Sequence, residues 1–533
     1  MNFIKWPIIS IVCFFIFTFI RLGYCYEVNV HKKITENAID QNISLLNESL
    51  IKIGIPNGVN EYILGQRVRY WIEEGSIKED EHFSPLVSFR YMNHFYNPLN
   101  NSGLADPPFF GMASSYEWGS NHAYNSWTWK LARDHFYNGL TKTTKTERES
   151  ASANAFRALG QVMHLVEDLA SPAHVRNDAH PTGDPYEVWT SANAASLDYS
   201  MVPFPYWNVS ISPSAPKQFW DLESYDGSMA YDSGYIGLAE YTGANFYSKD
   251  TIGIEATYPH PNRLNTNLGD FSLFPTTVIT TPDNITHTIF HVSGYGKQHL
   301  AALKYFGQEI LELPGGDVLM RYKLSLFLDN ECHKEYAQFL VPRAVGYSAG
   351  LLNYFFRGQI DMVPDPNNSG KYIIKNLSNE NMSGTFSLYY DDKIDIRRLI
   401  TSWENFSINA NGHSTPVTFT RPTSPEPKEK GKYILVFRGT QGNEAGAVVA
   451  RVITIKGEIN GRMVVLYDIL ATSVTVKTKT GPLFASIPTG DFRYAKSVRF
   501  DVDDPDTFVV LATHYDCTSN SCSGRYDFHK FFI

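Results

Sequence analysis

The sequence predicts a multidomain protein in which a mainly α-helical region is followed by an all-β region. The chain has 533 residues, more than one ordinary core holds, so we expect two or three domains. From residue 26 to about residue 358, apolar residues recur every three or four positions, as in a run of helix. After about Asp361, short β-branched segments alternate with turn-forming residues. These patterns predict helices first and an Ig-like β-sandwich after them.

Individual segments carry the two patterns. We expect helices in HKKITENAIDQNISLL, ASANAFRALGQVMHLVEDLA, GYGKQHLAALKYFGQEI and HKEYAQFLVPRAVGYSAGLLNYFF, with long polar and aromatic connections at 182–233 and a β-prone stretch at 276–292. We expect strands in GTFSLYYD, KYILVFRG, GAVVARVITI, RMVVLYDIL, SVTVKTKT and DTFVVLAT. The predicted domains are therefore 26–358 for the helical part and 359–455 for a β-sandwich, with 456–533 a second β-rich module or a continuation of the sandwich.

The first 25 residues are typical of a secretory signal peptide. Lys5 precedes an uncharged apolar run of about 15 residues, which is shorter than a membrane-spanning helix requires. Cleavage after Cys25 would make Tyr26 the first residue of a secreted or extracytoplasmic protein. An uncleaved signal anchor remains an alternative, because Arg21 lies close to that cleavage site.

Composition and charge narrow the possible functions. The chain is 43% apolar and 19% charged, which is typical of a globular protein. Its formal net charge of -9 provides no general basic field, so binding of duplex nucleic acid is not expected. Cys517 and Cys522 are close enough in sequence to form a disulfide in an oxidising compartment. Cys332 is interpreted as a buried structural residue, because no Cys/His pattern surrounds it in the sequence.

The segment HLVEDLASPAHVRND is the strongest chemical signal in the chain. Phe156, Leu159, Met163, Val166 and Leu169 have the spacing of a helix core, and His164 and Asp168 lie four residues apart on that helix. Four residues correspond to about 40° of rotation and about 6 Å of rise, so both side chains can hold one ion. Pro172 should end the helix and let His174 return to the same place. Imidazole and carboxylate together are ligands that suit zinc.

An H-x-x-x-D pair alone is more often a hydrogen-bonded surface pair than a metal site. The longer pattern H-x-x-x-D-x-x-x-P-x-H-x-x-N, from His164 to Asn177, resembles the signature of the zinc-dependent phospholipase C family, whose fold is shared with S1/P1-type single-strand nucleases. The resemblance implies three zinc ions per chain. It also implies as ligands the amine of the mature first residue, here Tyr26, together with His31, Asp80 and His94. The last two are 14 residues apart, as the family pattern requires.

The third zinc position matches the family less well. The resemblance implies His174, a further histidine and an acid four residues later, but the chain has HPTGDPYEVW, with Gly183 where that histidine should stand. We favour His180 and Glu187 as the remaining ligands, with Asp184 as a competing ligand or a supporting group.

The implied activity is hydrolysis of a phosphodiester by metal-activated water. In this interpretation Asp80 also takes the proton of the attacking water, and Asp168 bridges two metal ions. A phospholipid is the favoured substrate and the β region is a possible membrane contact. An S1/P1-type nuclease is the alternative, for which Tyr91, Phe95, Tyr96 or Trp189 could stack on a base, although core packing is the commoner role. A secreted binding protein in which zinc only stabilises the scaffold is the second alternative.

Overall fold

The computed structural model divides into two compact units. The first comprises the described residues within Met1–Leu46, Gly65–Ala132 and Ala153–Phe355, and the second those within Asn47–Leu64, Arg133–Ser152 and Phe356–Ile533. The structure describes residues 28–80, 90–105, 112–180, 183–204, 216–222, 225, 237–252, 273–280, 286–294, 297–312, 318–368, 370–429, 431–455, 464–466, 473–478, 483–488, 492–500, 507–518 and 521–532. The predicted signal peptide and Tyr26 lie outside these residues.

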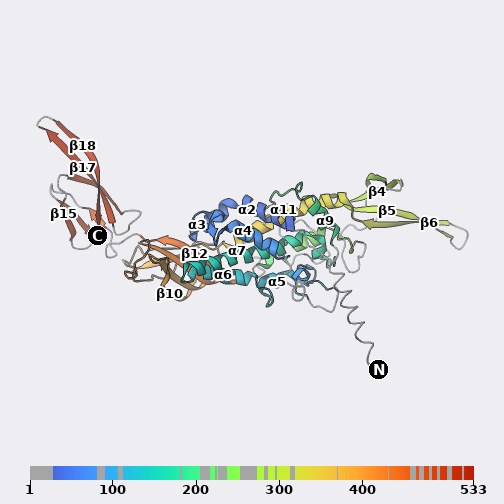
Figure 1. The fold of residues 1–533 in the computed structure, drawn as a ribbon, viewed down its shortest axis with the longest axis horizontal. Coiled ribbons are helices and arrows are strands. Elements are labelled where there is room, and N and C mark those ends of the chain that lie inside the picture. The colour runs from blue at the N-terminus through green and yellow to red at the C-terminus, as the bar shows by residue number, and fades with distance from the viewer. Residues whose placement is uncertain are drawn as a thin grey trace, which may run out of the picture. The chain divides into compact units, whose positions relative to one another are not determined.

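Helices form most of the first unit (Figure 1). In chain order the helices of the described residues are α2 (Val28–Gln41), α3 (Ile43–Lys52), α4 (Val68–Lys78), α5 (Ser115–Asn121), α6 (Trp129–Thr141), α7 (Lys145–Glu167), α8 (Pro172–Val175), α9 (Pro185–Ala192), α10 (Leu238–Asn245) and α11 (Asn330–Phe355). The helical prediction is confirmed for three of the four expected segments, which correspond to α2 with α3, to α7, and to α11. Helices α4, α5, α6, α9 and α10 lie outside the segments singled out in the sequence.

The core helix α7 packs closely on α4. All five residues predicted to face the core are buried, at 2% exposure or less. A Cβ added at Gly160 of α7 would lie 2.0 Å from the carbonyl oxygen of Ile72, and one at Gly75 of α4 would lie 2.1 Å from that of Arg157. Only glycine fits two backbones at this separation. The glycine pair therefore sets how closely α4 approaches the part of α7 that carries His164.

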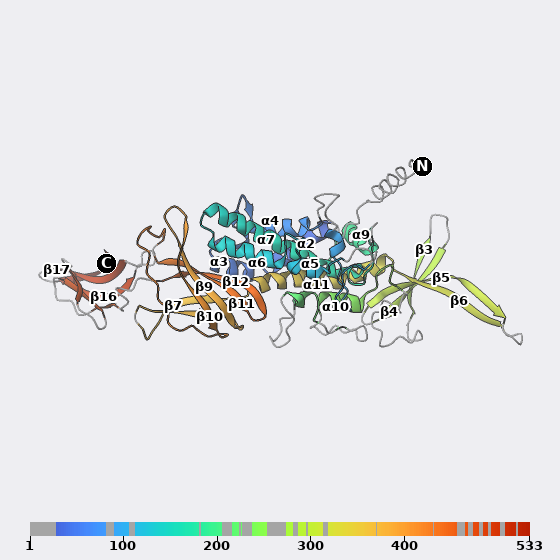
Figure 2. The ribbon, with the colours of Figure 1, turned by 90° about the horizontal axis from the view of Figure 1, so that it is seen from below.

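A four-stranded antiparallel sheet is inserted between α10 and α11 (Figure 2). Its strands are β3 (Leu273–Thr280), β4 (Thr286–Gly294), β5 (Lys297–Glu312) and β6 (Val318–Phe327), and they pair in sequence order. The β-prone stretch at 276–292 becomes β3 and β4. The expected helix GYGKQHLAALKYFGQEI is wrong, because these residues form the end of β4 and most of β5. Pairing of β5 with strands on both sides supplies backbone hydrogen bonds that override a weak helical pattern.

The second unit contains the β-sandwich. Strands β9 (Met382–Asp391), β10 (Arg397–Ile408), β11 (Lys432–Gln441) and β12 (Glu444–Thr454) form one sheet in the order β10-β9-β11-β12, while β7 (Ile360–Pro364) and β8 (Tyr372–Asn376) form another. Every second residue of a strand faces the core, as Tyr433, Leu435 and Phe437 do in β11. Both sheets contribute to one apolar core. The sandwich therefore encloses a core between two sheets, as the strand pattern predicts.

Buried charges join the helical and β parts of the second unit. Glu444 of β12 accepts hydrogen bonds from Arg133 at 2.8 Å and from Arg357 at 2.6 Å. Burial raises the pKa of Glu444, but the two guanidinium groups outweigh it and lower this pKa to about 2.

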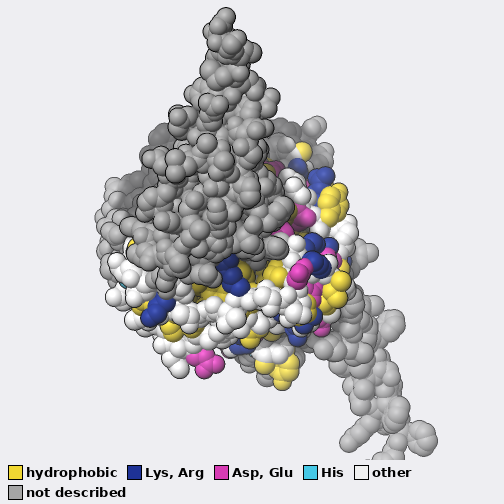
Figure 3. Space-filling model, turned by 90° about the vertical axis from the view of Figure 1, so that its left-hand side faces the viewer, with side chains coloured by type: hydrophobic (Ala, Val, Ile, Leu, Met, Phe, Trp, Pro, Cys, Tyr) yellow, Lys and Arg dark blue, Asp and Glu magenta, His cyan; other side chains and the backbone are white. Residues whose placement is uncertain are grey.

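On the face drawn in Figure 3, basic and acidic side chains are interspersed among the residues that are described. Mixed charge of this kind does not point to a polyanion as a partner.

The described strands that follow residue 455 form two three-stranded sheets. These are β13 (Val464–Leu466) with β14 (Ser473–Thr478) and β15 (Leu483–Pro488), and β16 (Phe492–Phe500) with β17 (Thr507–Thr518) and β18 (Ser521–Phe532). Cys517 of β17 is the Cα partner of Cys522 of β18, so the pairing considered from sequence spacing falls on facing backbone positions. The expected boundary near residue 456 lies outside the described residues. No helix among the described residues has both the length and the apolar character needed to cross a bilayer.

Candidate metal centre

Three groups of histidine and carboxylate side chains lie inside the first unit. Within each group the possible ligand atoms all lie within 4.8 Å of one another, and the groups are His31 with His164 and Asp168, Asp80 with His94 and His164, and His174 with His180 and Glu187. His164 belongs to two groups. The structure thus brings together eight of the ten residues predicted from the sequence.

Separate elements deliver these side chains. His31 lies on α2 and His164 on α7, while Asp80 follows the end of α4 and His94 follows a 3₁₀ turn at Arg90–Asn93. Helix α7 ends at Glu167 and continues as a 3₁₀ turn at Asp168–Ala170. The proline then begins a new helix instead of only ending the old one, because Pro172 occupies the first turn of α8. His174 therefore sits on a short helix.

Distances within the first two groups fit a shared metal coordination. Asp168 places Oδ1 3.3 Å from Nε2 of His31, and Oδ2 3.3 Å from Nε2 of His164 and 2.9 Å from Nδ1 of His94. Asp80 Oδ1 lies 3.5 Å from Nε2 of His164. Two ligands each about 2.1 Å from a tetrahedral zinc ion are separated by roughly 3.4 Å. The two oxygens of Asp168 thus face different histidines, as a bridging carboxylate does.

Hydrogen bonds on the far side of the rings direct Nε2 of four histidines toward the carboxylates. Nδ1 of His31 lies 2.8 Å from Oε2 of Glu167, and Nδ1 of His164 lies 2.7 Å from the carbonyl oxygen of Ser76. Nδ1 of His174 and of His180 lies 3.2 Å and 2.8 Å, respectively, from a backbone carbonyl oxygen. Support of one ring nitrogen by a carboxylate or a carbonyl is the usual arrangement for histidines that bind metal through the other nitrogen.

His94 is oriented the other way round. Its Nδ1 faces Asp168, and its Nε2 lies 3.7 Å from Oε1 of Glu79. The same Glu79 accepts hydrogen bonds from Arg90 and, at 2.8 Å, from Nε1 of Trp118. Burial lowers the pKa of His94, but Asp168 and Glu79 raise it, and the result is a pKa of about 9. Glu79 therefore acts on His94 through its charge, without the hydrogen bond that Glu167 makes with His31.

In the segment HPTGDPYE, the structure brings His180 and Glu187 into the third group. Glu187, in the first turn of α9, places Oε1 3.0 Å from Nε2 of His174 and Oε2 3.3 Å from Nε2 of His180. Asp184 lies outside the group and caps α9 by accepting hydrogen bonds from the backbone N–H of Tyr186 and of Glu187. This geometry favours Glu187 over Asp184 as the ligand.

Electrostatics distinguish the two acids further. Burial raises the pKa of Glu187, but His180 and His174 lower it more, and it falls to about 2. Burial and the neighbouring Glu187 raise the pKa of Asp184 to about 7. A carboxyl group that is partly protonated at neutral pH is a weaker metal ligand than one that is fully ionised.

The polar atoms that face the centre fit a metal ion. Both carboxylate oxygens of Asp168 and of Glu187, together with Nε2 of His164 and of His174, are buried and receive no hydrogen bond from any described residue. A buried carboxylate without such partners would carry a large desolvation cost. Divalent cations coordinated by these atoms would offset that cost, and imidazole with carboxylate is a donor set that zinc prefers.

Two supporting carboxylates, Glu167 and Glu79, were missed in the sequence. Each directly precedes a predicted ligand, Asp168 and Asp80, so the pairs ED in HLVEDLA and in IKEDEH were the available signal. Glu167 is fully buried and accepts hydrogen bonds from four side chains, Thr35, Ser76, His31 and Ser348. When two acids are adjacent in the sequence, one can therefore be a metal ligand while the other orients a different ligand.

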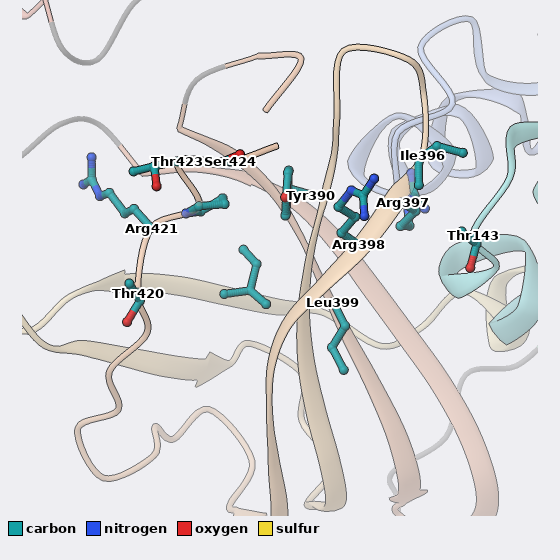
Figure 4. Close-up of a pocket in the computed structure, with 12 residues that line it drawn as sticks. Thr143, Tyr390, Ile396, Arg397, Arg398, Leu399, Thr420, Arg421, Thr423 and Ser424 are labelled. Atoms are coloured by element: carbon teal, nitrogen blue, oxygen red, sulfur yellow. The ribbon is translucent and has the colours of Figure 1, made fainter. Parts of the chain in front are cut away.

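A hollow in the second unit differs from the metal centre, because neither histidines nor carboxylates are among the described residues that line it. It is lined by residues that include Thr143, Arg397, Arg398 and Thr420 (Figure 4). Arg397 binds Asp391 at 2.8 Å and Arg398 binds Asp392 at 2.9 Å. Because carboxylates already neutralise these two guanidinium groups, the hollow is not a strong anion site.

Comparisons with known proteins add little to this geometry. No protein-family model matches the chain, and no curated protein sequence matches it. Among solved structures, the alpha toxin from Clostridium absonum is 12% identical, with a TM-score of 0.25, over 86% of this chain and 98% of the toxin. The alpha-toxin of Clostridium perfringens from avian strain SWCP is 10% identical, with a TM-score of 0.21, over 96% of this chain and 99% of the toxin. Likenesses this weak do not establish a shared fold.

Proposed function

We propose that the protein is an exported zinc-dependent phosphodiesterase of the phospholipase C type. The observation that carries the proposal is the set of three histidine and carboxylate groups in a helical unit, two of which share His164. The pattern HLVEDLASPAHVRND, which resembles the zinc-dependent phospholipase C signature, supports the same conclusion. One zinc ion per group gives three per chain, and the free amine of Tyr26 would complete the set after cleavage of the signal peptide.

Bound zinc ions would lower the pKa of a coordinated water and neutralise charge on the phosphate oxygens. The chain's own residues would then position the reactants. His31, His164 and His174 are held by hydrogen bonds behind their rings, so the ligand geometry is fixed before substrate binds. Fixed ligands reduce the reorganisation needed when negative charge develops in the transition state.

Asp80 is the proposed base. Its Oδ1 faces His164 and His94, whereas Oδ2 receives no hydrogen bond from any described residue, and its side chain is 5% exposed. Burial raises the pKa of Asp80, but the histidines outweigh it and lower this pKa, so the carboxylate is ionised and can accept a proton. Asp80 would take the proton of the attacking water through Oδ2.

A phospholipid head group is the favoured substrate class. The net charge of -9 disfavours a polyanionic strand. Of the four aromatic residues proposed as a base-stacking platform, Phe95 and Tyr96 are buried, and the ring of Phe95 stacks on His174 at 4.6 Å. These two rings serve packing, which weakens the nuclease alternative. The β region would provide contact with a membrane surface.

A substrate panel tests the proposal. The exported full chain is assayed with phosphatidylcholine, other phospholipids, single-stranded DNA and RNA, and a small chromogenic diester, each with zinc and with a chelator. We expect zinc-dependent release of phosphocholine, abolished by D80N and retained by E73Q, which alters a buried carboxylate that binds Arg69 instead of a ligand histidine. Cleavage of the nucleic acids alone would identify a nuclease, and stoichiometric zinc without turnover would identify a binding protein.

The N-terminal ligand has its own test. Mass spectrometry of the exported chain should give a mature start at Tyr26. A start elsewhere would remove the N-terminal amine from the proposed ligand set while leaving the other ligands in place.

A further inference from the structure

A fourth cluster of potential metal ligands lies in the first unit, and it contains a cysteine. His291 of β4, Asp329 just before α11 and Cys332 in the first turn of α11 place their possible ligand atoms within 4.8 Å of one another. His291 and Cys332 are fully buried. No local sequence pattern indicates this group, because 37 residues separate His291 from Asp329 along the chain.

Asp329 holds the cluster together with both carboxylate oxygens. Oδ1 caps α11 by accepting hydrogen bonds from the backbone N–H of Glu331 at 3.1 Å and of Cys332 at 3.0 Å. Oδ2 lies 2.8 Å from Nε2 of His291. The cap fixes Cys332 close to the carboxylate, and the histidine joins the inserted sheet to the start of α11.

A purely structural role leaves one feature unexplained. Nδ1 of His291 is buried and has no hydrogen-bond partner among the described residues. Buried polar atoms are nearly always hydrogen-bonded, and one that is not has a cost of about 1–3 kcal/mol. A ligand that accepts the lone pair of a ring nitrogen removes this cost. The orphaned Nδ1 lies across the ring from Nε2, which faces Asp329, so an ion shared with Asp329 and Cys332 would replace the hydrogen bond at Nε2.

A further imidazole lies beside the group. The ring of His299 meets the ring of His291 edge-on, with 4.6 Å between the centroids. Nδ1 of His299 lies 3.2 Å from Oε2 of Glu335, which is the support that a metal-binding histidine normally has. His299 is thus the candidate for a fourth coordination position.

A role for Cys332 as a catalytic nucleophile fits the structure less well than a role as a metal ligand. Catalytic thiols are ionised and at least partly exposed. Burial, and then the neighbouring Asp329, raise the pKa of Cys332 far above its usual range, and the side chain has no exposed surface. Coordination of a divalent cation would favour the thiolate of Cys332 over the thiol, because the thiol proton is displaced to solvent.

We propose that His291, Asp329 and Cys332 form a separate structural metal site that takes zinc or a similar thiophilic divalent ion. Thiolate, imidazole and carboxylate are all zinc ligands, and the thiolate disfavours magnesium and calcium. The ion would cross-link β4 to the first turn of α11. The site is independent of the proposed hydrolysis, because none of its residues belongs to the three groups described above.

Cobalt substitution tests the site without any measurement of turnover. The full chain is stripped of metal, loaded with cobalt(II) and examined for the near-ultraviolet charge-transfer absorption of a cobalt–thiolate bond. The three histidine and carboxylate groups contain no cysteine, so this absorption reports only a cysteine site. We expect the band in the wild type, its loss in C332S, and its retention in the matched control C517S/C522S.

Elemental analysis provides the second measurement. C332S and H291Q should each contain about one zinc equivalent less per chain than the wild type. H291Q retains the thiol and thus separates loss of a ligand from loss of the cysteine itself. A wild-type protein without the thiolate band, a band that persists in C332S, or wild-type zinc content in both variants would overturn the proposal. Failure of diester hydrolysis would not change any of these results.

Discussion

Glu167 offers the sharpest test of how the candidate metal centre is organised. Oε1 accepts hydrogen bonds from Thr35 at 2.8 Å and Ser348 at 3.1 Å, while Oε2 accepts from His31 at 2.8 Å and Ser76 at 3.2 Å. The substitution E167Q keeps the shape of the side chain and removes its charge. The amide oxygen can still face His31, because hydroxyl groups on the other side can rotate to accept from the new NH₂.

The expected effect of E167Q follows from these contacts. A hydrogen bond to a charged partner is worth about 1–1.5 kcal/mol more than one to a neutral partner. That difference corresponds to roughly tenfold weaker zinc binding at His31. E167A is different, because it leaves four buried donors without their acceptor. At about 1–3 kcal/mol for each donor that stays unsatisfied, E167A should lower the free energy of unfolding by at least about 3 kcal/mol.

The assay is chelator competition on the full chain, read by elemental analysis, together with urea unfolding. E73Q is the matched control, because Glu73 is also a buried acid but binds Arg69. We expect E167Q to lose zinc at a lower chelator concentration than the wild type, with little change in unfolding. Zinc affinity identical in E167Q and the wild type would refute the supporting role of Glu167.

Three further predictions follow from the geometry. E187Q should lose the third zinc ion, whereas D184N should keep it with little change in stability, because asparagine caps a helix about as well as aspartate; the reverse pattern in elemental analysis would show that Asp184 is the ligand. G160A should destabilise the protein by about 1–3 kcal/mol or more in urea unfolding, because its Cβ meets the Ile72 carbonyl; an unchanged midpoint would contradict this close packing. Glu444 has a folded pKa of about 2, below its unfolded value of about 4.5, so its contribution of about 3 kcal/mol is present above about pH 4.5 and lost as pH falls toward 2. The stability difference between wild type and E444Q should shrink over that range, and a constant difference would contradict the assignment.

Local periodicity explains which parts of the fold could be predicted. In β9 and β11 every second residue of the central part belongs to the apolar core, and α7 carries apolar residues at every third or fourth position, so local patterns predict these elements. Segment 294–310 is predicted as a helix but forms the end of β4 and most of β5. Its strand conformation depends on pairing with β4 and β6, which a local pattern does not contain.

Residues of the candidate metal centre could be predicted only where they form a local sequence pattern. A motif with fixed offsets, such as His164 with Asp168, can be recognised because one helix fixes both positions. Glu167 and Glu79 could not be assigned, because their role depends on hydrogen bonds to residues far away in the chain. The cluster of His291, Asp329 and Cys332 was also hidden, since only the folded chain brings a strand residue to the start of α11.

The central claim is that the joined histidine and carboxylate groups hold the zinc ions that hydrolyse a phosphodiester. His164 belongs to two of the three groups, so H164A tests this claim most directly. The measurement is zinc content and phosphodiester hydrolysis in the same preparation, with circular dichroism to confirm folding. A folded H164A should contain less zinc than the wild type and show no hydrolysis. A folded H164A with the zinc content and rate of the wild type would contradict the account.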